Sequence, residues 1–259
     1  LRLDAEQAGH VTVWLEAPED RSLPGILAPA LRAALFKLDR IAGAADGAKR
    51  ALKALAGFIS AMKVKFGDVE VGLEIDGEAG LADTGNLEND LADLLEATGQ
   101  AARERNIAFV LFIDELQYVP EEQLAALISA LHRCAQRQLP ITLVGAGLPQ
   151  LVGQTGRAKS YAERLFDFPE ISTLTPDAAR AALVVPASKL NVEFTDGALA
   201  EILKQTQGYP YFLQEWGKHA WAAADASPIE TEDALRATND AMDDLDASFF
   251  RVRLDRLTP

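Results

Sequence analysis

Two adjacent acidic residues follow a strongly apolar segment near the middle of the sequence. Residues 107–113 read IAFVLFI, and Asp114 and Glu115 come directly after them. An apolar run without alternation is typical of a strand that is covered on both faces. Open α/β sheets bind ligands at the carboxyl ends of their strands. One carboxylate there can hold the water shell of a Mg²⁺ ion, and the second can orient an attacking water. The alternative is a buried strand that happens to end in two surface acids.

Strand-like and helix-like segments alternate around this pair. Short β-rich segments at 10–16 and 141–144 predict two further strands, and the second ends at Gly145-Ala146-Gly147. Apolar residues at helical spacing predict helices at 24–41, 46–62, 86–105 and 121–138. Alternation around Gly67-Asp68 predicts a β-hairpin insertion near residues 63–75. The alternation predicts an α/β fold with a parallel sheet and helices on both faces.

The predicted secondary structure changes near Leu174, from alternating strands and helices to helices alone. Thr175-Pro176 resembles a helix N-cap followed by proline at the first helical position. Beyond it we find only helical patterns, at about 176–187, 196–207, 210–224 and 231–246, with a last one past Ala247. We therefore predict two domains, an α/β core at 1–173 and an all-helical lid domain at 174–259.

Composition narrows the classes of function. The 259 residues carry a formal net charge of -14, which opposes direct binding of a phosphate backbone. The single cysteine, Cys134, excludes an internal disulfide and favours a cytoplasmic location. No apolar run approaches the length of a membrane span, so no membrane partner is expected. His10, His132 and His219 show no ligand spacing, so no structural metal site is expected either.

Several motifs occur in the order found in one ATPase family. They are FVLFIDELQYVP at 109–120, GAGLP at 145–149, RLF at 164–166 and GYPYFLQ at 208–214. Together they resemble bacterial and archaeal AAA+/STAND P-loop ATPases related to origin-recognition proteins, over most of the chain from about His10 to Pro259. The resemblance implies an incomplete P-loop ATPase core followed by a helical lid, with ATP or ADP and Mg²⁺ as ligands.

The resemblance also implies site residues. In that family the acidic Walker B pair binds metal through water and activates the attacking water, which corresponds to Asp114 and Glu115. Asp114 is the residue expected at Mg²⁺. A Gly-x-Pro motif in the lid touches the nucleotide base, which corresponds to Gly208, Tyr209 and Pro210. An arginine after the sensor strand can reach a phosphate, and Arg164 is the positional match. A turn between two helices is the alternative for 208–210, and a surface arginine is the alternative for Arg164.

Three departures from the family concern the nucleotide. The family's P-loop comes before the strand at 10–16, on a strand in the middle of the sheet. We therefore expect either a central gap that another segment or chain fills, or residues before Leu1 that complete the sheet. The sensor strand usually ends in a polar residue, whereas this one ends in Gly145-Ala146-Gly147. The family usually continues into a winged-helix domain beyond the lid. The segment Gly153–Ser160 (GQTGRAKS) approximates a P-loop, but Ala158 replaces its second glycine and Pro149 separates it from the preceding strand.

These features predict a regulatory switch that holds ATP between the core and the lid. The full-length protein is expected to hydrolyse ATP, and residues 1–259 are expected to be inactive without a P-loop. Two alternatives stay open: an interaction scaffold that binds no nucleotide, and the ATPase part of a DNA-binding regulator. The expected partners are a nucleotide and a protein partner or a second copy of the chain, with DNA reached only through a missing C-terminal domain.

Overall fold

The computed structural model of the protein describes residues 1–42, 46–63, 65–66, 69–70 and 76–251. The chain divides into two compact units, Leu1–Phe168 and Pro169–Pro259. Each unit has its own hydrophobic core. None of the described helices is both long enough and apolar enough to cross a membrane. The predicted fold class is confirmed: a parallel-sheet α/β core is followed by an all-helical domain.

The sheet of the first unit has three parallel strands in the order β1-β4-β5. The strands are β1 (Val11–Glu16), β4 (Phe109–Asp114) and β5 (Ile141–Gly145). Val13 pairs with Leu111, which pairs in turn with Leu143. The predicted gap in the middle of the sheet is wrong, because β4 bonds directly to β1 on one side and to β5 on the other. Among the described residues, β1 and β5 each pair on one side only, so the sheet has two open edges and no open position at its centre.

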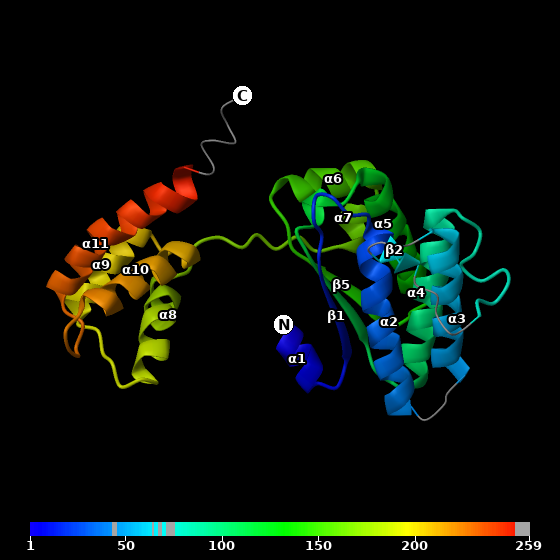
Figure 1. The fold of residues 1–259 in the computed structure, drawn as a ribbon, viewed down its shortest axis with the longest axis horizontal. Coiled ribbons are helices and arrows are strands. Elements are labelled where there is room, and N and C mark those ends of the chain that lie inside the picture. The colour runs from blue at the N-terminus through cyan, green and yellow to red at the C-terminus, as the bar shows by residue number, and fades with distance from the viewer. Residues whose placement is uncertain (43–45, 64, 67–68, 71–75, 252–259) are drawn as a thin grey trace. The chain divides into compact units, whose positions relative to one another are not determined.

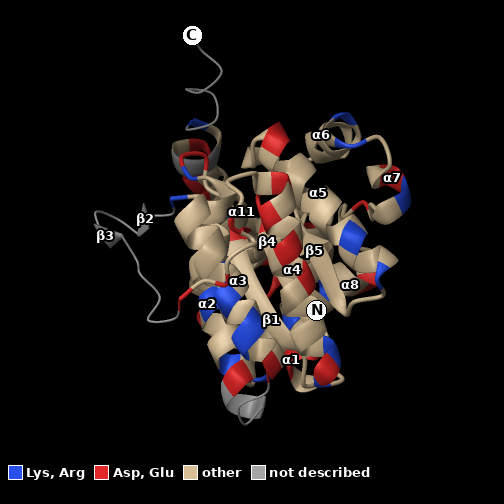
Figure 2. Ribbon diagram, turned by 90° about the vertical axis from the view of Figure 1, so that its right-hand side faces the viewer, with Lys and Arg blue, Asp and Glu red and all other residues tan. Residues whose placement is uncertain are grey.

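Helices cover one face of this sheet (Figure 1). They are α2 (Leu23–Ala42), α3 (Asp46–Ala61), α4 (Leu87–Glu104) and α5 (Glu121–Gln136). The odd-numbered strand residues pack against them in one core, with Val13, Leu111 and Ile113 all buried. Figure 2 shows that the strands themselves carry almost no charged residues, as a buried sheet requires.

The even-numbered residues form the other face of the sheet. Thr12, Val110 and Thr142 make one row across it, and Trp14, Phe112 and Val144 make the next. Thr12 donates a hydrogen bond to Glu6 of the short helix α1 (Arg2–Gln7), but no residue of α1 is buried. Trp14 is 51% exposed and Thr142 is exposed as well. Of the described helices, α2–α5 lie on the odd-numbered face and only the short α1 contacts the even-numbered face, so the predicted cover of both faces is present but uneven.

Shorter elements complete the first unit. The strands β2 (Lys65–Phe66) and β3 (Val69–Glu70) pair antiparallel in a sheet of their own. The rest of the predicted hairpin, including Gly67-Asp68 and 71–75, lies outside the described residues. After β5 come two helices that the sequence patterns did not predict, α6 (Gln150–Ala158) and α7 (Ala162–Leu165), in the segment before Leu174.

The second unit is a helical domain built around Trp216. Its helices are α8 (Pro176–Ser188), α9 (Asp196–Thr206), α10 (Pro210–Ala223) and α11 (Thr231–Leu245), and a π-helical turn follows at Asp246–Phe250. Trp216 packs in the core and donates from its indole N–H to Thr238 of α11 at 3.0 Å. Thr175 and Thr195 cap α8 and α9 by accepting hydrogen bonds from backbone N–H groups. The predicted helix order of this domain agrees with the structure.

A buried carboxylate fixes the start of α4, and this generates a stability prediction. Asp90 is fully buried and accepts hydrogen bonds from the Thr84 N–H, the Thr84 hydroxyl and the Gly85 N–H, at 2.7–3.0 Å. We expect Asp90→Ala to lower the free energy of unfolding by about 1–3 kcal/mol, because it removes the acceptor of three part-buried hydrogen bonds that hold the Thr84-Gly85 segment against α4. Chemical unfolding followed by circular dichroism measures this. The control is Asp93→Ala on the same helix, whose carboxylate makes a partly exposed ion pair with Arg133. Equal losses for the two variants would contradict the assignment.

Candidate functional site

The two predicted carboxylates lie at the carboxyl end of the central strand. Asp114 is the last residue of β4, it is exposed, and it lies level with Glu16 at the end of β1. One of its carboxylate oxygens accepts the Glu115 N–H at 2.9 Å. The hydrogen bonding between β1 and β4 continues to this last residue, since the Asp114 carbonyl accepts the Ala17 N–H at 3.0 Å. The remaining lone pairs of the Asp114 carboxylate face outward, which suits a ligand made of water or metal-bound water.

Glu115 adopts a backbone conformation that is uncommon for its residue type. Its φ is 55° and its ψ is 35°, which is the left-handed region, and it precedes a single 3₁₀ turn at Leu116–Tyr118. Non-glycine residues in this region are uncommon and cluster at functional sites. The Glu115 carboxylate accepts a short hydrogen bond from the side-chain amide of Gln117. The turn and this hydrogen bond therefore orient the Glu115 side chain together.

Gln117 is a residue of this site that sequence patterns did not reveal. Its side chain is buried, and while its amide N–H donates to Glu115 its amide oxygen accepts the Leu148 N–H at 3.1 Å. Its backbone carbonyl accepts from the Gln154 side chain at 3.3 Å. Gln117 thus links the loop after β4 to the segment after β5. The only signal in the sequence was a glutamine two residues after Glu115. A glutamine at such a position is too common to mark a site residue.

The glycines at the end of β5 are explained by close packing. A Cβ atom on Gly145 would lie 2.3 Å from the Leu116 side chain, and one on Gly147 would lie 2.7 Å from the Gln117 amide oxygen. The main chain also pairs here, since the Leu116 N–H donates to the Ala146 carbonyl at 3.0 Å. Gly145-Ala146-Gly147 therefore allows the ends of β4 and β5 to approach closely. A polar sensor side chain is absent from these three positions, as the sequence indicated.

Arg164 lies elsewhere in the first unit. It is exposed on α7 and lines a shallow hollow with His132, Ala135 and Gln136 from the second half of α5. The carboxylate pair precedes the first turn of α5, and that helix rises about 1.5 Å per residue, so its two ends are roughly 20 Å apart. The structure does not bring Arg164 next to Asp114 and Glu115. Its assignment to a phosphate stays a prediction.

The segment Gly153–Ser160 does not form a phosphate loop. Its first six residues, Gly153–Ala158, lie within α6, where backbone N–H groups are used inside the helix. The ammonium of Lys159 contacts the Glu88 carboxylate of α4 at 2.9 Å. Hydrogen bonds from Lys159 and Ser129 hold the pKa of Glu88 below its usual range. This lysine is thus engaged in packing the flank of the first unit.

The predicted base-contacting residues form the turn between α9 and α10. Gln207 and Gly208 both have positive φ, of 48° and 73°, and Pro210 occupies the first turn of α10. The Gly208 carbonyl accepts the Leu174 N–H at 2.9 Å, and a Cβ on Gly208 would lie 2.7 Å from the Leu174 carbonyl oxygen. Tyr209 is 43% exposed, with its ring 4.9 Å from that of Phe212. The glycine is required by packing, and contact of 208–210 with a base stays a prediction.

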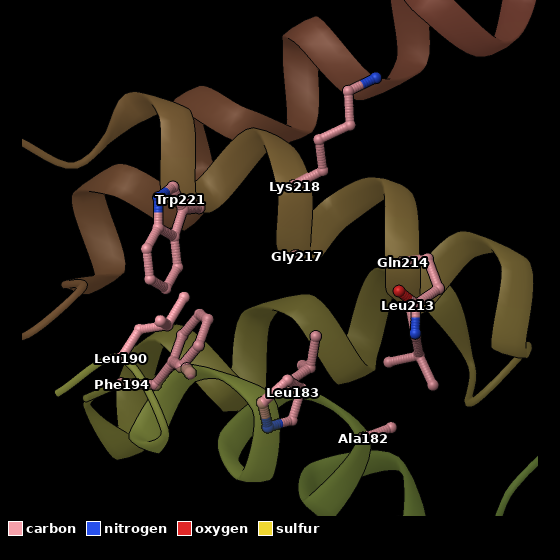
Figure 3. Close-up of a pocket in the computed structure, with 11 residues that line it drawn as sticks. Ala182, Leu183, Leu190, Phe194, Leu213, Gln214, Gly217, Lys218 and Trp221 are labelled. Atoms are coloured by element: carbon pink, nitrogen blue, oxygen red, sulfur yellow. The ribbon is translucent and has the colours of Figure 1, made fainter. Parts of the chain in front are cut away.

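The helical domain also contains an apolar groove between α8 and α10 (Figure 3), with a volume of about 270 Å³. Leu183, Leu190, Phe194, Leu213 and Trp221 line it together with smaller residues. Lys218 lies at the rim, and its side chain points away from the groove. Because carbon dominates the lining, the groove offers little to a phosphate group.

The cysteine of the sequence, Cys134, belongs to the hydrophobic core. Cys134 is fully buried in α5, and burial raises the pKa of its thiol to about 12. A thiol of that kind is protonated at neutral pH and is a poor nucleophile. It acts as a small apolar side chain in the core.

Comparison with known proteins gives similarity in fold alone. No known protein family and no curated protein matches the sequence. Among solved structures, a variant of RuvB from Thermotoga maritima is 22% identical over 60% of this chain and 59% of the RuvB chain, with a TM-score of 0.42. The T. maritima RuvB structure described as a Holliday junction branch migration motor is 21% identical over 59% of this chain and 57% of that chain, with a TM-score of 0.41. Another T. maritima RuvB variant is 22% identical over 75% of this chain and 69% of the RuvB chain, with a TM-score of 0.43. The chain therefore spans less than two thirds of the length of the first two RuvB structures.

The role of Gln117 generates a prediction that needs no ligand. We expect Gln117→Ala to lower the free energy of unfolding by about 1–3 kcal/mol, because it removes the acceptor of a part-buried backbone N–H and the partner of Glu115. Thermal or urea unfolding measures the loss. Gln136→Ala, at an exposed position of α5, is the matched control and should change stability little. If both variants unfold like the parent, Gln117 does not hold the two loops together.

Proposed function

We propose that the protein is an ATP-dependent regulatory ATPase of the AAA+/STAND type, in which nucleotide state controls the helical lid. ATP or ADP with Mg²⁺ would be held by the α/β core and the lid. The observation that carries this proposal is the Asp114-Glu115 pair at the carboxyl end of a buried central strand, with Glu115 oriented by Gln117. The proposed partners are a nucleotide and a protein or a second copy of the chain. The proposed location is the cytoplasm.

The two carboxylates have different environments, which suits two different roles. Asp114 is exposed at the strand end and keeps lone pairs for the water shell of Mg²⁺, which would neutralise phosphate charge when bound. Glu115 is restrained by its backbone turn and by Gln117. A restrained carboxylate can accept a proton from an attacking water and hold that water in line. Asp114 is thus proposed for metal binding and Glu115 for water activation.

The open edge and the bare face of the sheet support a missing phosphate-binding unit. The Ala146 N–H donates to β4, and alternation along a strand then directs the N–H and C=O groups of Leu143 and Gly145 to the open side. Unpaired backbone groups and the exposed Trp14 face both need cover. A strand beside β5, followed by a helix across the even-numbered face, would supply both.

The handedness of the fold agrees with this arrangement. The connections from β1 to β4 and from β4 to β5 run in one direction across the sheet and place α2–α5 on the odd-numbered face. Crossovers between parallel strands are right-handed in nearly all proteins. A connection that runs back from beyond β5 to β1 must therefore place its helix on the opposite face. That is the face that α2–α5 do not cover, where Trp14 and Thr142 are exposed while Val110 and Phe112 are buried. We therefore propose that a strand and helix preceding Leu1 carry the P-loop.

An interaction scaffold is the alternative that the same open edge favours. Strand addition to an exposed edge is a common mode of peptide recognition, and it requires no nucleotide. The two proposals differ in what must occupy the edge: a P-loop strand of the same chain, or a strand from another protein. Binding of ATP by the completed protein separates them.

The first test concerns the carboxylates. In the protein with its P-loop present, Glu115→Gln should keep ATP binding and reduce hydrolysis by ~10²–10⁴-fold, because an amide cannot accept the proton. Asp114→Ala should also weaken Mg²⁺-dependent binding. Phosphate release and calorimetric titration measure the two effects. Glu122→Gln in the first turn of α5 is the matched control, since Glu122 is exposed and lies outside the pair. Unchanged hydrolysis in both Asp114→Ala and Glu115→Gln would refute the assignment.

The second test concerns completion of the sheet. Residues 1–259 alone should bind ATP weakly at best and should not hydrolyse it, because a triphosphate meets a net charge of -14 with no P-loop to hold it. The protein extended by the segment encoded before Leu1 should bind ATP with Mg²⁺. It should also slow hydrogen exchange at the Leu143 and Gly145 amides relative to residues 1–259. Micromolar ATP binding by residues 1–259, or unchanged exchange at both amides in the extended protein, would contradict the proposal.

A further inference from the structure

Three potential metal ligands converge between two helices of the helical domain. Glu215 and His219 lie four residues apart on α10, so they share one face of that helix, and Asp244 faces them from α11. One ligand atom from each residue lies within 4.8 Å of the other two. His219 Nε2 is 3.1 Å from Asp244 Oδ2 and 3.9 Å from Glu215 Oε2. Sequence patterns did not reveal this group, because Asp244 is far from Glu215 and His219 along the chain.

The Nε2 atom of His219, between the two carboxylates, is buried without a hydrogen-bond partner. The His219 side chain is 13% exposed, and its Nε2 atom is shielded from solvent. Nε2 makes no hydrogen bond of acceptable geometry, although the Asp244 carboxylate is close to it. Lone pairs of metal ligands point at a shared centre and not at one another. A short separation without hydrogen-bond geometry is what such a ligand set produces when the centre carries no ion.

A cation already approaches the two carboxylates from the exposed side. Lys218 Nζ is 3.4 Å from Glu215 Oε2 and 3.8 Å from Asp244 Oδ2. Figure 3 shows its side chain directed away from the apolar groove. The Lys218 side chain is 62% exposed, and exposed ion pairs of this kind contribute little to stability. A divalent ion can therefore displace the ammonium at small cost.

We propose that Glu215, His219 and Asp244 form a binding site for a divalent transition-metal ion, with Zn²⁺ as the preferred ion. One imidazole nitrogen with two carboxylate oxygens is a donor set of the zinc type, and Mg²⁺ and Ca²⁺ prefer oxygen alone. Zinc bonds to these atoms are about 2.0–2.2 Å long, so neighbouring ligands of a tetrahedral site are roughly 3.3–3.5 Å apart. The two separations from His219 Nε2, 3.1 and 3.9 Å, bracket that value, and the two carboxylate oxygens lie within 4.8 Å of each other. A fourth position, on the side of Lys218, is left for water.

Such an ion would join α10 to α11. α10 begins at Pro210, directly after the Gly208-Tyr209 turn, and α11 leads into the turn at Asp246–Phe250. An ion held by Glu215, His219 and Asp244 would therefore fix the middle of α10 against the last turn of α11. The metal would stabilise the helical domain whether or not the protein binds ATP, so this site is independent of the function proposed above.

Metal binding is tested on the full chain, first stripped with a chelator. Titration with Co²⁺ should produce the visible absorption of a low-symmetry site, at one ion per chain. Zn²⁺ should abolish that absorption, and Mg²⁺ should not. At about a hundredfold excess over its dissociation constant, Zn²⁺ should raise the unfolding temperature of the helical domain by on the order of 10 °C. Absence of both the absorption and the thermal shift overturns the proposal.

Three variants distinguish a metal site from an ion-pair cluster. His219→Ala should abolish the Co²⁺ absorption and the thermal shift, and His132→Ala on α5 should leave both unchanged. Lys218→Met should tighten binding, because the ion no longer displaces an ammonium from the carboxylates. This third variant keeps the test decisive if His219→Ala folds poorly. Unchanged binding in His219→Ala, or weaker binding in Lys218→Met, would overturn the assignment.

Discussion

The structure of the first unit depends on the hydrogen bonding of one strand. β4 is buried from Phe109 to Ile113, and its backbone groups are satisfied by β1 on one side and β5 on the other. Because burial of unpaired N–H and C=O groups is costly, this pairing fixes the register of all three strands. It also fixes where β4 ends, and hence where Asp114 and Glu115 lie. The geometry of the carboxylate pair is a consequence of strand pairing.

The same constraint gives the outer strand β5 a different character. Within the described part of the chain it pairs on one side only, as β1 does, and its residues are less buried than those of β4. The glycines at its end bring the Leu116-Gln117 turn close to the backbone, so the loops after β4 and β5 form one hydrogen-bonded unit. This unit orients Glu115 through Gln117. The oriented carboxylate at the end of β4 and the open edge of β5 therefore lie next to each other in the sheet.

The helical domain is organised by different forces. Apolar packing around Trp216 and capping by threonine hydroxyls define its helices, and its described residues form a single β-bridge, Phe194 with Ile229, and no sheet. Charged side chains can therefore lie close together where two helices pack against each other. Glu215, His219, Lys218 and Asp244 form such a group beside the core, on the seam between α10 and α11.

The sequence by itself determined the elements whose signals are local. Unbroken apolar runs marked β4, helical spacing marked α2–α5 and α8–α11, and the acidic pair was visible from its position after a strand. Local patterns carry this information because side-chain periodicity follows directly from backbone geometry. They did not reveal α6 and α7, which are short and contain few apolar residues.

Only the tertiary structure decided which distant residues meet. The order β1-β4-β5 replaced a predicted central gap with an open edge, because pairing between strands depends on the whole fold. The link from Gln117 to Leu148, the displacement of Arg164 from the carboxylates, and the approach of Asp244 to His219 all arise from packing between segments far apart in the chain. No periodicity in a sequence records such contacts, since they depend on how elements are arranged in space once each has formed.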